Sequence, residues 1–189
     1  MPRLVFLAGP HGAGKSTFHE TYLSKSGLKF VNADRLTAGL GIRNEEAATV
    51  ADRLRADLLA AGESFITETV FSDPVGAKLD FLKEAIAANY RVTLYFVGLA
   101  NSDLSGARVW QRVQAGGHDV PPDRLVRRYE QSLKNLASAL SFVPEAHVFD
   151  NSSSQRPYRL VLSTGHGVIT DAVSPMPAWL APAMSDLRS

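Results

Sequence analysis

The sequence predicts an α/β fold in which a five-stranded parallel sheet carries helices on both faces. Short apolar runs alternate with amphipathic segments along about 150 residues, the pattern of successive strand–helix–strand units. A glycine-rich loop directly follows the first apolar run, at the carboxyl end of the first predicted strand. The chain has 189 residues, of which 45% are hydrophobic and 21% are charged, so residues 1–189 are expected to form a single domain.

The first three elements are predicted to be a strand, a helix and a second strand. Leu4–Ala8 is a continuous apolar run, typical of a strand that is buried on both faces. Ser16–Ser26 is predicted to be helical, with Gly27 just after its end. Lys29–Asn32 is predicted to be the second strand, and it leads directly to Asp34.

Two further helices and two further strands follow in alternation. Glu45–Ala61 carries apolar residues at helical spacing and is predicted to be a helix. Ser64–Thr67 is predicted to be the third strand, which places Glu68 at its carboxyl end. Pro74–Asn89 has a second apolar stripe and is predicted to be helical, and Arg91–Val97 is predicted to be the fourth strand.

The last part of the chain contains two helices, a strand and a tail. Leu104–Gln114 and Asp123–Val143 are predicted to be helices, joined by a segment rich in glycine and proline that cannot be regular helix. Ala146–Phe149 is predicted to be the fifth strand. Residues 153–189 form a C-terminal extension, in which two short segments around a glycine turn predict a hairpin.

The strongest motif is a glycine-rich loop that matches the pattern G-x-x-x-x-G-K-[ST] throughout. Its residues are Gly9, Pro10, His11, Gly12, Ala13, Gly14, Lys15, Ser16 and Thr17. Glycines let backbone N–H groups converge on phosphate oxygens, and the N-terminus of the next helix favours the same anion. Lys15 is expected to bind the β- and γ-phosphates, Ser16 to supply a hydroxyl to Mg²⁺, and His11 to have no chemical role. The loop predicts a P-loop NTPase fold that binds ATP and Mg²⁺.

Two acidic residues stand at strand ends, where the ligand crevice of an open α/β sheet lies. Asp34 is the candidate to accept the proton of an acceptor hydroxyl; the alternative is a helix cap or a partner for Arg35. Glu68 is the candidate to bind acceptor hydroxyls or to reach Mg²⁺ through water; the alternative is an exposed acid without a role. No other strand leads clearly into the metal-binding Asp of motor and switch ATPases, which favours a small-molecule kinase.

Five arginines and no lysine lie within residues 105–130. Arginine suits bidentate phosphate contacts and the stabilisation of transferred charge. Arg108 and Arg112 share a helix face and Arg128 lies on the next helix, so this segment is predicted to be a lid that brings arginines onto the phosphates. The alternative is a solvated basic face. His118, between the two helices, is expected to be structural or to donate a hydrogen bond to the substrate.

Taken in order, these segments resemble the short bacterial members of the zeta-toxin-like P-loop kinases. The resemblance covers residues 4–152 and rests on Gly9–Thr17, Asn32-Ala33-Asp34, Glu68-Thr69-Val70-Phe71-Ser72, Arg108–Arg112, Gly116–Pro121, Arg127-Arg128-Tyr129 and Asp150-Asn151-Ser152. It implies a nucleoside-monophosphate-kinase-like core with a helical lid, which transfers the γ-phosphate of ATP to a hydroxyl of a small molecule. In the toxins the acceptor is the 3′-hydroxyl of UDP-N-acetylglucosamine.

The resemblance also implies roles for single residues. Lys15 binds phosphate, Asp34 is the catalytic base, and Glu68 and Thr69 bind the acceptor. The three lid arginines stabilise the transferred charge, and Asn151 belongs to the nucleotide site. An antitoxin protein is the partner that the resemblance suggests.

The charge balance excludes some classes of function. The chain has 20 Lys and Arg against 19 Asp and Glu, a formal net charge of +1. A kinase acting on nucleic-acid ends would need an extended basic groove, so we expect no nucleic-acid partner. The apolar runs are too short to cross a bilayer and cysteine is absent, which predicts no membrane partner and a cytoplasmic location. The remaining alternative is a P-loop ATPase or nucleotide-binding module without a small-molecule acceptor.

Overall fold

A single mixed sheet runs through the structure, a computed structural model that describes residues 1–41, 43–114, 121–185 and 187. The strands of the described residues, in chain order, are β1 (Arg3–Ala8), β2 (Lys29–Val31), β3 (Phe65–Thr69), β4 (Arg91–Gly98), β5 (Glu145–Asp150), β6 (Arg159–Gly165) and β7 (Val168–Ala172). They lie in the order β2-β3-β1-β4-β5-β6-β7. The first five pair in parallel, as predicted.

The prediction of a five-stranded sheet is wrong in its count, because the described residues form seven strands. The predicted C-terminal hairpin is present as β6 and β7, and it pairs antiparallel with β5 instead of standing apart from the sheet. An edge strand exposes unpaired backbone N–H and C=O groups. The hairpin covers that edge of β5 and so extends the sheet.

Strand β1 occupies a central position because its residues are apolar toward both faces. Phe6 and Leu7, whose side chains point to opposite faces of the sheet, are both fully buried. The pairing register places Ala8 beside Thr69 of β3 and Phe96 of β4, so the three strands end near one edge of the sheet. The glycine-rich loop and the acidic end of β3 therefore start from the same edge.

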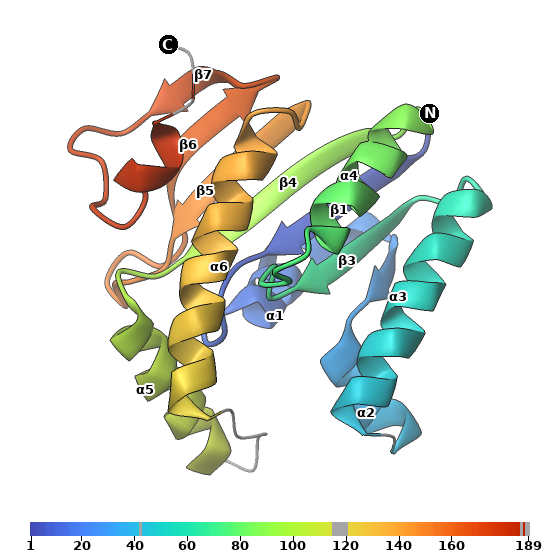
Figure 1. The fold of residues 1–189 in the computed structure, drawn as a ribbon, viewed down its shortest axis with the longest axis horizontal. Helices are drawn as coiled ribbons and strands as arrows, with labels where there is room; N and C mark the ends of the chain where they lie inside the picture. The colour runs from blue at the N-terminus through green and yellow to red at the C-terminus, as the bar shows by residue number, and fades with distance from the viewer. Residues whose placement is uncertain (42, 115–120, 186, 188–189) are drawn as a thin grey trace.

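Helices lie on both faces of the sheet, as predicted. The helical segments are α1 (Lys15–Phe18), η1 (His19–Leu23), η2 (Ser24–Ser26), α2 (Ala33–Leu40), α3 (Asn44–Ala60), α4 (Ala77–Ala87), α5 (Ser102–Gln114), α6 (Pro122–Leu140) and η3 (Ala181–Met184). In Figure 1, α3, α4 and α6 lie in front of the sheet and α1 lies behind it. Within the described chain, no helix has both the length and the hydropathy to span a bilayer.

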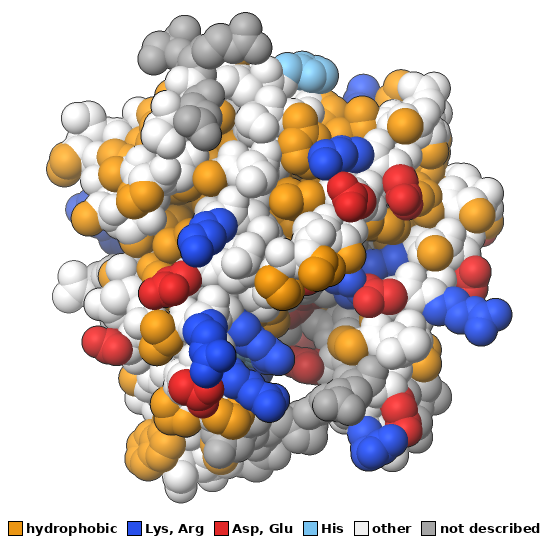
Figure 2. Space-filling view, in the orientation of Figure 1, with side chains coloured by type: hydrophobic (Ala, Val, Ile, Leu, Met, Phe, Trp, Pro, Cys, Tyr) orange, Lys and Arg blue, Asp and Glu red, His pale blue; other side chains and the backbone are white. Residues whose placement is uncertain are grey.

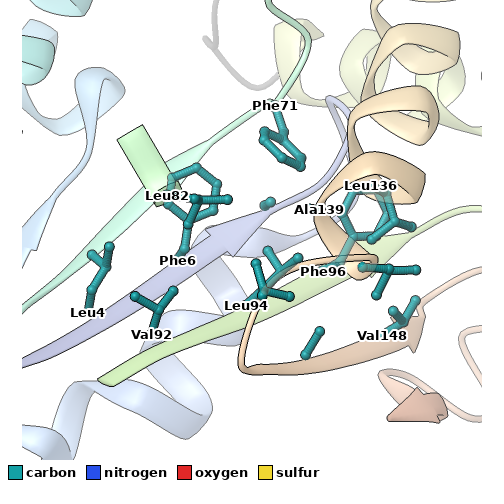
Figure 3. Close-up of a cluster of buried hydrophobic side chains, with 14 of the residues drawn as sticks. Leu4, Phe6, Phe71, Leu82, Val92, Leu94, Phe96, Leu136, Ala139 and Val148 are labelled. Atoms are coloured by element: carbon teal, nitrogen blue, oxygen red, sulfur yellow. The ribbon is translucent and has the colours of Figure 1, made fainter. Parts of the chain in front are cut away.

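The larger hydrophobic core lies between the sheet and the helices in front of it (Figure 3). Phe6 of β1, Leu82 of α4 and Leu136 of α6 are fully buried in this core. Phe71, which follows β3, packs edge-on against Phe6 with ring centroids 5.4 Å apart. Burying each such side chain contributes about 1.5–3 kcal/mol. Phe18 of α1 belongs to a second cluster on the opposite face.

Three helical segments differ from the predicted elements. Ser16–Ser26 is helical but not one α-helix, since α1 passes into the π-helical η1 and the 3₁₀-helical η2. Helix α2 is absent from the predicted elements because its eight residues are too few for a clear apolar stripe. The Asn32 side chain caps it by accepting a hydrogen bond from the backbone N–H of Arg35 at 3.0 Å. Helix α4 begins at Ala77, later than predicted, because Gly76 precedes it with a φ of 82°.

Trp179 anchors the C-terminal extension to the sheet. Its side chain is buried and stacks on Phe96 of β4, with ring centroids 6.3 Å apart. A Cβ atom on Gly98, the last residue of β4, would lie 2.1 Å from the Cη2 atom of the indole. Glycine at this position therefore leaves the space that the indole fills.

Candidate active site

The glycine-rich loop connects β1 to α1 and folds back on itself around Lys15. Gly9 has a φ of 142°, and a Cβ atom there would lie 2.1 Å from the Val97 carbonyl oxygen. Lys15 is buried, and its Nζ donates a hydrogen bond to the Pro10 carbonyl oxygen at 3.0 Å. Burial lowers the pKa of the Lys15 ammonium. A phosphate group would replace the carbonyl as an anionic partner for this cation, so the loop fits a nucleotide.

Two residues that follow β5 hold the loop from behind. The Asn151 side chain is buried and its Nδ2 donates a hydrogen bond to the Ala13 carbonyl oxygen at 2.8 Å. The Tyr158 hydroxyl donates to the Gly14 carbonyl oxygen at 2.9 Å. Asn151 was expected in the nucleotide site; the structure places it against the back of the loop, where it supports the loop's shape. Tyr158 was missed, because no local pattern marks a tyrosine that contacts a loop 144 positions earlier.

Ser16 and Glu68 face each other across the ends of β1 and β3. The Ser16 hydroxyl lies 3.2 Å from Oε1 and 3.1 Å from Oε2 of Glu68, to which it donates. The Asn32 side chain donates from Nδ2 to Oε2 of the same carboxylate at 2.6 Å. A hydroxyl and a carboxylate are the hard oxygen ligands that Mg²⁺ prefers, and the ion keeps several waters and substrate phosphates as its other ligands. This pair therefore fits the predicted metal position.

Asp34 lies in the first turn of α2 and lines the same cleft as Ser16 and Glu68. Its side chain is exposed and lines the cleft that contains Lys15 and Glu68. The carboxylates of Glu68 and Asp34 oppose the effect of burial and raise the pKa of Lys15. Thr69 also lines the cleft, and its hydroxyl accepts a hydrogen bond from the Phe71 N–H at 3.2 Å. Asp34 is thus the accessible acid beside the phosphate loop, whereas Glu68 is buried and engaged.

Three arginines line the opposite wall of the cleft. Arg108 of α5 donates from Nη2 to the Asn151 carbonyl oxygen at 2.8 Å. Nη1 of Arg128, on α6, lies 2.9 Å from Nε2 of His11. Arg112 is exposed at the same wall. The second of these contacts joins α6 to the phosphate loop through the side chain of His11, for which no chemical role was expected. The lid formed by this segment stays a prediction.

The cleft has a volume of about 670 Å³. Figure 2 shows it as a hollow near the lower centre of this face, with basic side chains gathered along one side. The predicted site residues that line it are His11, Gly12, Gly14, Lys15, Ser16, Thr17, Asp34, Glu68, Thr69, Arg108, Arg112 and Arg128. Gly9, Pro10 and Ala13 belong to the loop but lie away from the lining. His118 lies outside the described residues.

Helix α3 contributes a buried arginine that the sequence analysis missed. Arg55 donates from Nε to the Thr67 hydroxyl at 2.5 Å and from Nη2 to the Glu68 carbonyl oxygen at 3.1 Å. It also pairs with Asp52, which pairs in turn with Lys78 of α4. Burial lowers the pKa of Arg55, and the Asp52 carboxylate raises it. Arg55 thus fixes the backbone that carries Glu68 and forms the wall of the cleft that faces the arginines.

A family model with the description Zeta toxin matches residues 29–160, more than half of the chain. The chain belongs to the zeta toxin family. The matched region covers β2 to β5 and the first two residues of β6, with Asp34, Glu68 and the three arginines, and it begins after the phosphate loop. No curated protein matches this zeta toxin family member.

Solved structures show the fold of this family member. A chain from the PezAT chromosomal toxin-antitoxin system of Streptococcus pneumoniae aligns with a TM-score of 0.63 and 16% identity, over 86% of this chain and 71% of that one. A chain of the AvrRxo1-ORF1:AvrRxo1-ORF2 complex aligns with a TM-score of 0.66 and 17% identity, over 100% of this chain. The zeta toxin family member spans 65% of that AvrRxo1 chain.

Shikimate kinase from Acinetobacter baumannii aligns with a TM-score of 0.51 and 16% identity, over 84% of this chain and 88% of that enzyme. At such identities these similarities establish the fold, which is that of the P-loop kinases. The predicted fold class is confirmed in this respect.

Proposed function

We propose that the protein is an ATP-dependent kinase that transfers the γ-phosphoryl group of ATP to a hydroxyl group of a small molecule. The observation that carries the proposal is the convergence of four features in one cleft: a phosphate loop, an oxygen pair suited to Mg²⁺, an accessible carboxylate and three arginines. Membership of the zeta toxin family and the P-loop kinase fold support it.

We assign the part of the cleft around the phosphate loop and the arginines to the nucleotide, and the rest of the cleft to the acceptor. Lys15 and the three arginines provide the cationic surroundings that a triphosphate needs. Asp34 and the wall formed by α3 and the end of β3 lie beyond the phosphate loop, where the acceptor would bind. Thr69 lines this part and would contact the acceptor. Ser16 and Glu68 would hold Mg²⁺, which when bound offsets the negative charge of the phosphates.

The proposed reaction needs one base and several fixed cations. A bond forms between the acceptor oxygen and the γ-phosphorus, the bond from that phosphorus to the β–γ bridging oxygen breaks, and ADP leaves. The hydroxyl proton moves to a carboxylate oxygen of Asp34. Lys15, Arg112 and Arg128 stabilise the charge that spreads over the transferred oxygens, and positioned charges of this kind supply most of the catalysis in phosphoryl transfer.

A screen of candidate acceptors would identify the class of molecule that the protein phosphorylates. Purified protein with Mg·ATP is incubated with nucleotide sugars, nucleosides, antibiotics and sugars, and phosphate transfer is followed by radiolabel or mass shift. UDP-N-acetylglucosamine is tested first, since the family resemblance implies it. ATP consumption that is equal with and without every acceptor, with no phosphorylated product, would favour the alternative of a P-loop ATPase.

The substitution Asp34→Asn tests the assignment of the base. Asparagine keeps the size and most of the hydrogen bonding but cannot take the proton. We expect nearly unchanged ATP affinity and a transfer rate at least about a hundredfold lower, within the usual contribution of general-base catalysis. Asp57→Asn is the matched control, because Asp57 is exposed on α3 outside the cleft.

Two results would contradict this role of Asp34. An unchanged transfer rate would mean that the carboxylate takes no proton. Loss of ATP binding with normal transfer per bound ATP would make Asp34 a residue of the Mg²⁺ site, and Glu68 would become the candidate base.

An antitoxin is the protein partner that we propose. The structure from Streptococcus pneumoniae comes from a toxin-antitoxin system, and the AvrRxo1 structure is a complex of two proteins. If the protein is a toxin, expression of the wild type alone should stop growth, and co-expression with its antitoxin should restore growth. Normal growth of cells that express the wild type alone would contradict a toxin role.

A further inference from the structure

His11 links the phosphate loop to both helices that carry the arginines. Its backbone carbonyl oxygen accepts a hydrogen bond from the Ser105 hydroxyl of α5 at 2.7 Å. Its ring Nε2 lies 2.9 Å from Nη1 of Arg128 on α6, 117 positions later in the chain. Among the described residues, the ring bonds to Arg128, and a substitution of the side chain leaves the backbone contact to Ser105 available.

The direction of the His11–Arg128 hydrogen bond follows from the chemistry of the two groups. A guanidinium has five N–H donors and no acceptor, so Nε2 of His11 must accept and the ring must be neutral. Burial and the charges of Lys15, Arg128 and Arg112 lower the pKa of His11 to about 3. The imidazole therefore keeps its Nε2 lone pair throughout the physiological pH range.

The three cleft arginines of α5 and α6 are held in different ways. Arg108 donates to a backbone carbonyl after β5, and Arg112 is exposed. Arg128 is half-buried and donates to a side chain of the phosphate loop itself. A free arginine loses close to 2 kcal/mol of rotamer entropy when it is fixed on a ligand. A hydrogen bond that fixes it before the ligand arrives reduces this loss.

We propose that His11 is a positioning residue that holds the Arg128 guanidinium beside the phosphate loop, ready to bind the phosphates of ATP. The inference rests on the proposed function, since it takes the cleft to be a nucleotide site. The bond to His11 uses one of the five N–H groups of Arg128, which leaves the others for phosphate oxygens. His11 thereby acts on the nucleotide through Arg128.

Substitutions of His11 separate this role from a structural one. His11→Leu has a similar volume but no acceptor, and His11→Asn keeps an amide that is too short to place an oxygen where Nε2 lies. His11→Gln places its amide oxygen near that position. We expect the first two variants to bind Mg·ATP about tenfold more weakly by calorimetry, the low end for loss of a hydrogen bond to a charged group. His11→Gln should stay within about threefold of the wild type by the same reasoning.

The same substitutions are made in an Arg128→Ala background. There we expect His11→Leu and His11→Asn to change ATP affinity by less than about twofold, since interacting residues are not additive. An equal loss in both backgrounds, or no loss in either, would overturn the role of His11. Failure of His11→Gln to restore affinity would also overturn it. Thermal unfolding of each variant checks that it is folded, and either of the first two variants suffices for the test.

The binding measurement needs no acceptor, so the two proposals can fail separately. If the wild type binds ATP but phosphorylates nothing in the screen, the proposed kinase activity fails and the comparison of His11 variants still gives an answer. If the wild type binds no ATP, the nucleotide site itself is refuted and the positioning role with it.

Discussion

Gly98→Ala should cost stability because the added methyl group meets the indole of Trp179. The new Cβ atom would lie 2.1, 2.5 and 2.6 Å from three carbon atoms of the ring, all far inside van der Waals contact. The ring cannot turn aside freely, since it is buried and stacked on Phe96. Expelling it resembles truncation of a buried aromatic side chain, which costs about 3–5 kcal/mol. We therefore expect the free energy of unfolding to fall by roughly 3 kcal/mol.

Urea denaturation followed by tryptophan fluorescence measures this change. The chain has two tryptophans, and Trp110 is exposed, so a Trp110→Phe background makes Trp179 the reporter. In that background Gly98→Ala should lower the urea midpoint and shift the emission of the folded protein toward that of an exposed indole. The matched control is Gly106→Ala on α5, where the nearest atom to the new Cβ is Leu125 Cδ1 at 3.9 Å.

Gly106→Ala should leave stability unchanged or raise it by up to about 1 kcal/mol, the difference in helix propensity. In a Trp179→Ala background, Gly98→Ala should cost less than about 1 kcal/mol, because the clashing ring is gone. A Gly98→Ala protein whose unfolding free energy and Trp179 emission equal those of its parent would refute the packing argument.

Two further predictions concern the cleft. Lys15→Ala should abolish phosphate transfer without lowering the thermal unfolding temperature, because the buried Nζ serves the ligand and not the core. Lys25→Ala, a control at an exposed position, should keep full transfer. Transfer by a folded Lys15→Ala protein would contradict the assignment of the site. Backbone amides in the described parts of segment 105–130 should exchange more slowly with Mg·ATP and acceptor bound, because Arg108, Arg112 and Arg128 are proposed to contact phosphate in that state. Equal exchange in the free and liganded protein, measured by mass spectrometry, would leave these arginines as a solvated face.

The sequence was sufficient to predict the features that depend on neighbouring residues. The phosphate loop is a local motif, and the buried strand before Gly9 follows from one apolar run. The approach of Glu68 to Ser16 could also be anticipated. Glu68 lies at the carboxyl end of β3, and Ser16 follows the loop that leaves the carboxyl end of β1; the ends of neighbouring parallel strands meet at one edge of a sheet. The parallel arrangement of the strands therefore made it possible to predict that Ser16 and Glu68, 52 positions apart in the chain, lie close together.

Features that depend on which surfaces happen to pack together could not be predicted. Arg55 looks like an ordinary charged residue on an amphipathic helix, and only the contact of α3 with the end of β3 buries it. The hairpin was predicted as a unit, but its pairing with β5 requires knowledge of which strand edge is free. The hydrogen bond between His11 and Arg128 likewise forms only because α6 brings Arg128 to the loop.

The contacts of Asn151 and Tyr158 with the phosphate loop have a consequence for the order in which the working site forms during translation. The ribosome completes the nucleotide-binding motif when it adds Thr17, yet the residues that hold Ala13 and Gly14 from behind lie 138 and 144 positions downstream of those two. A growing chain therefore carries the whole motif long before it can hold the motif in shape. Domains fold as units during synthesis. Nucleotide binding by this chain should consequently begin late, after Tyr158, which directly precedes β6, has emerged, and a nascent chain that is shorter than this would be inactive while it is being made.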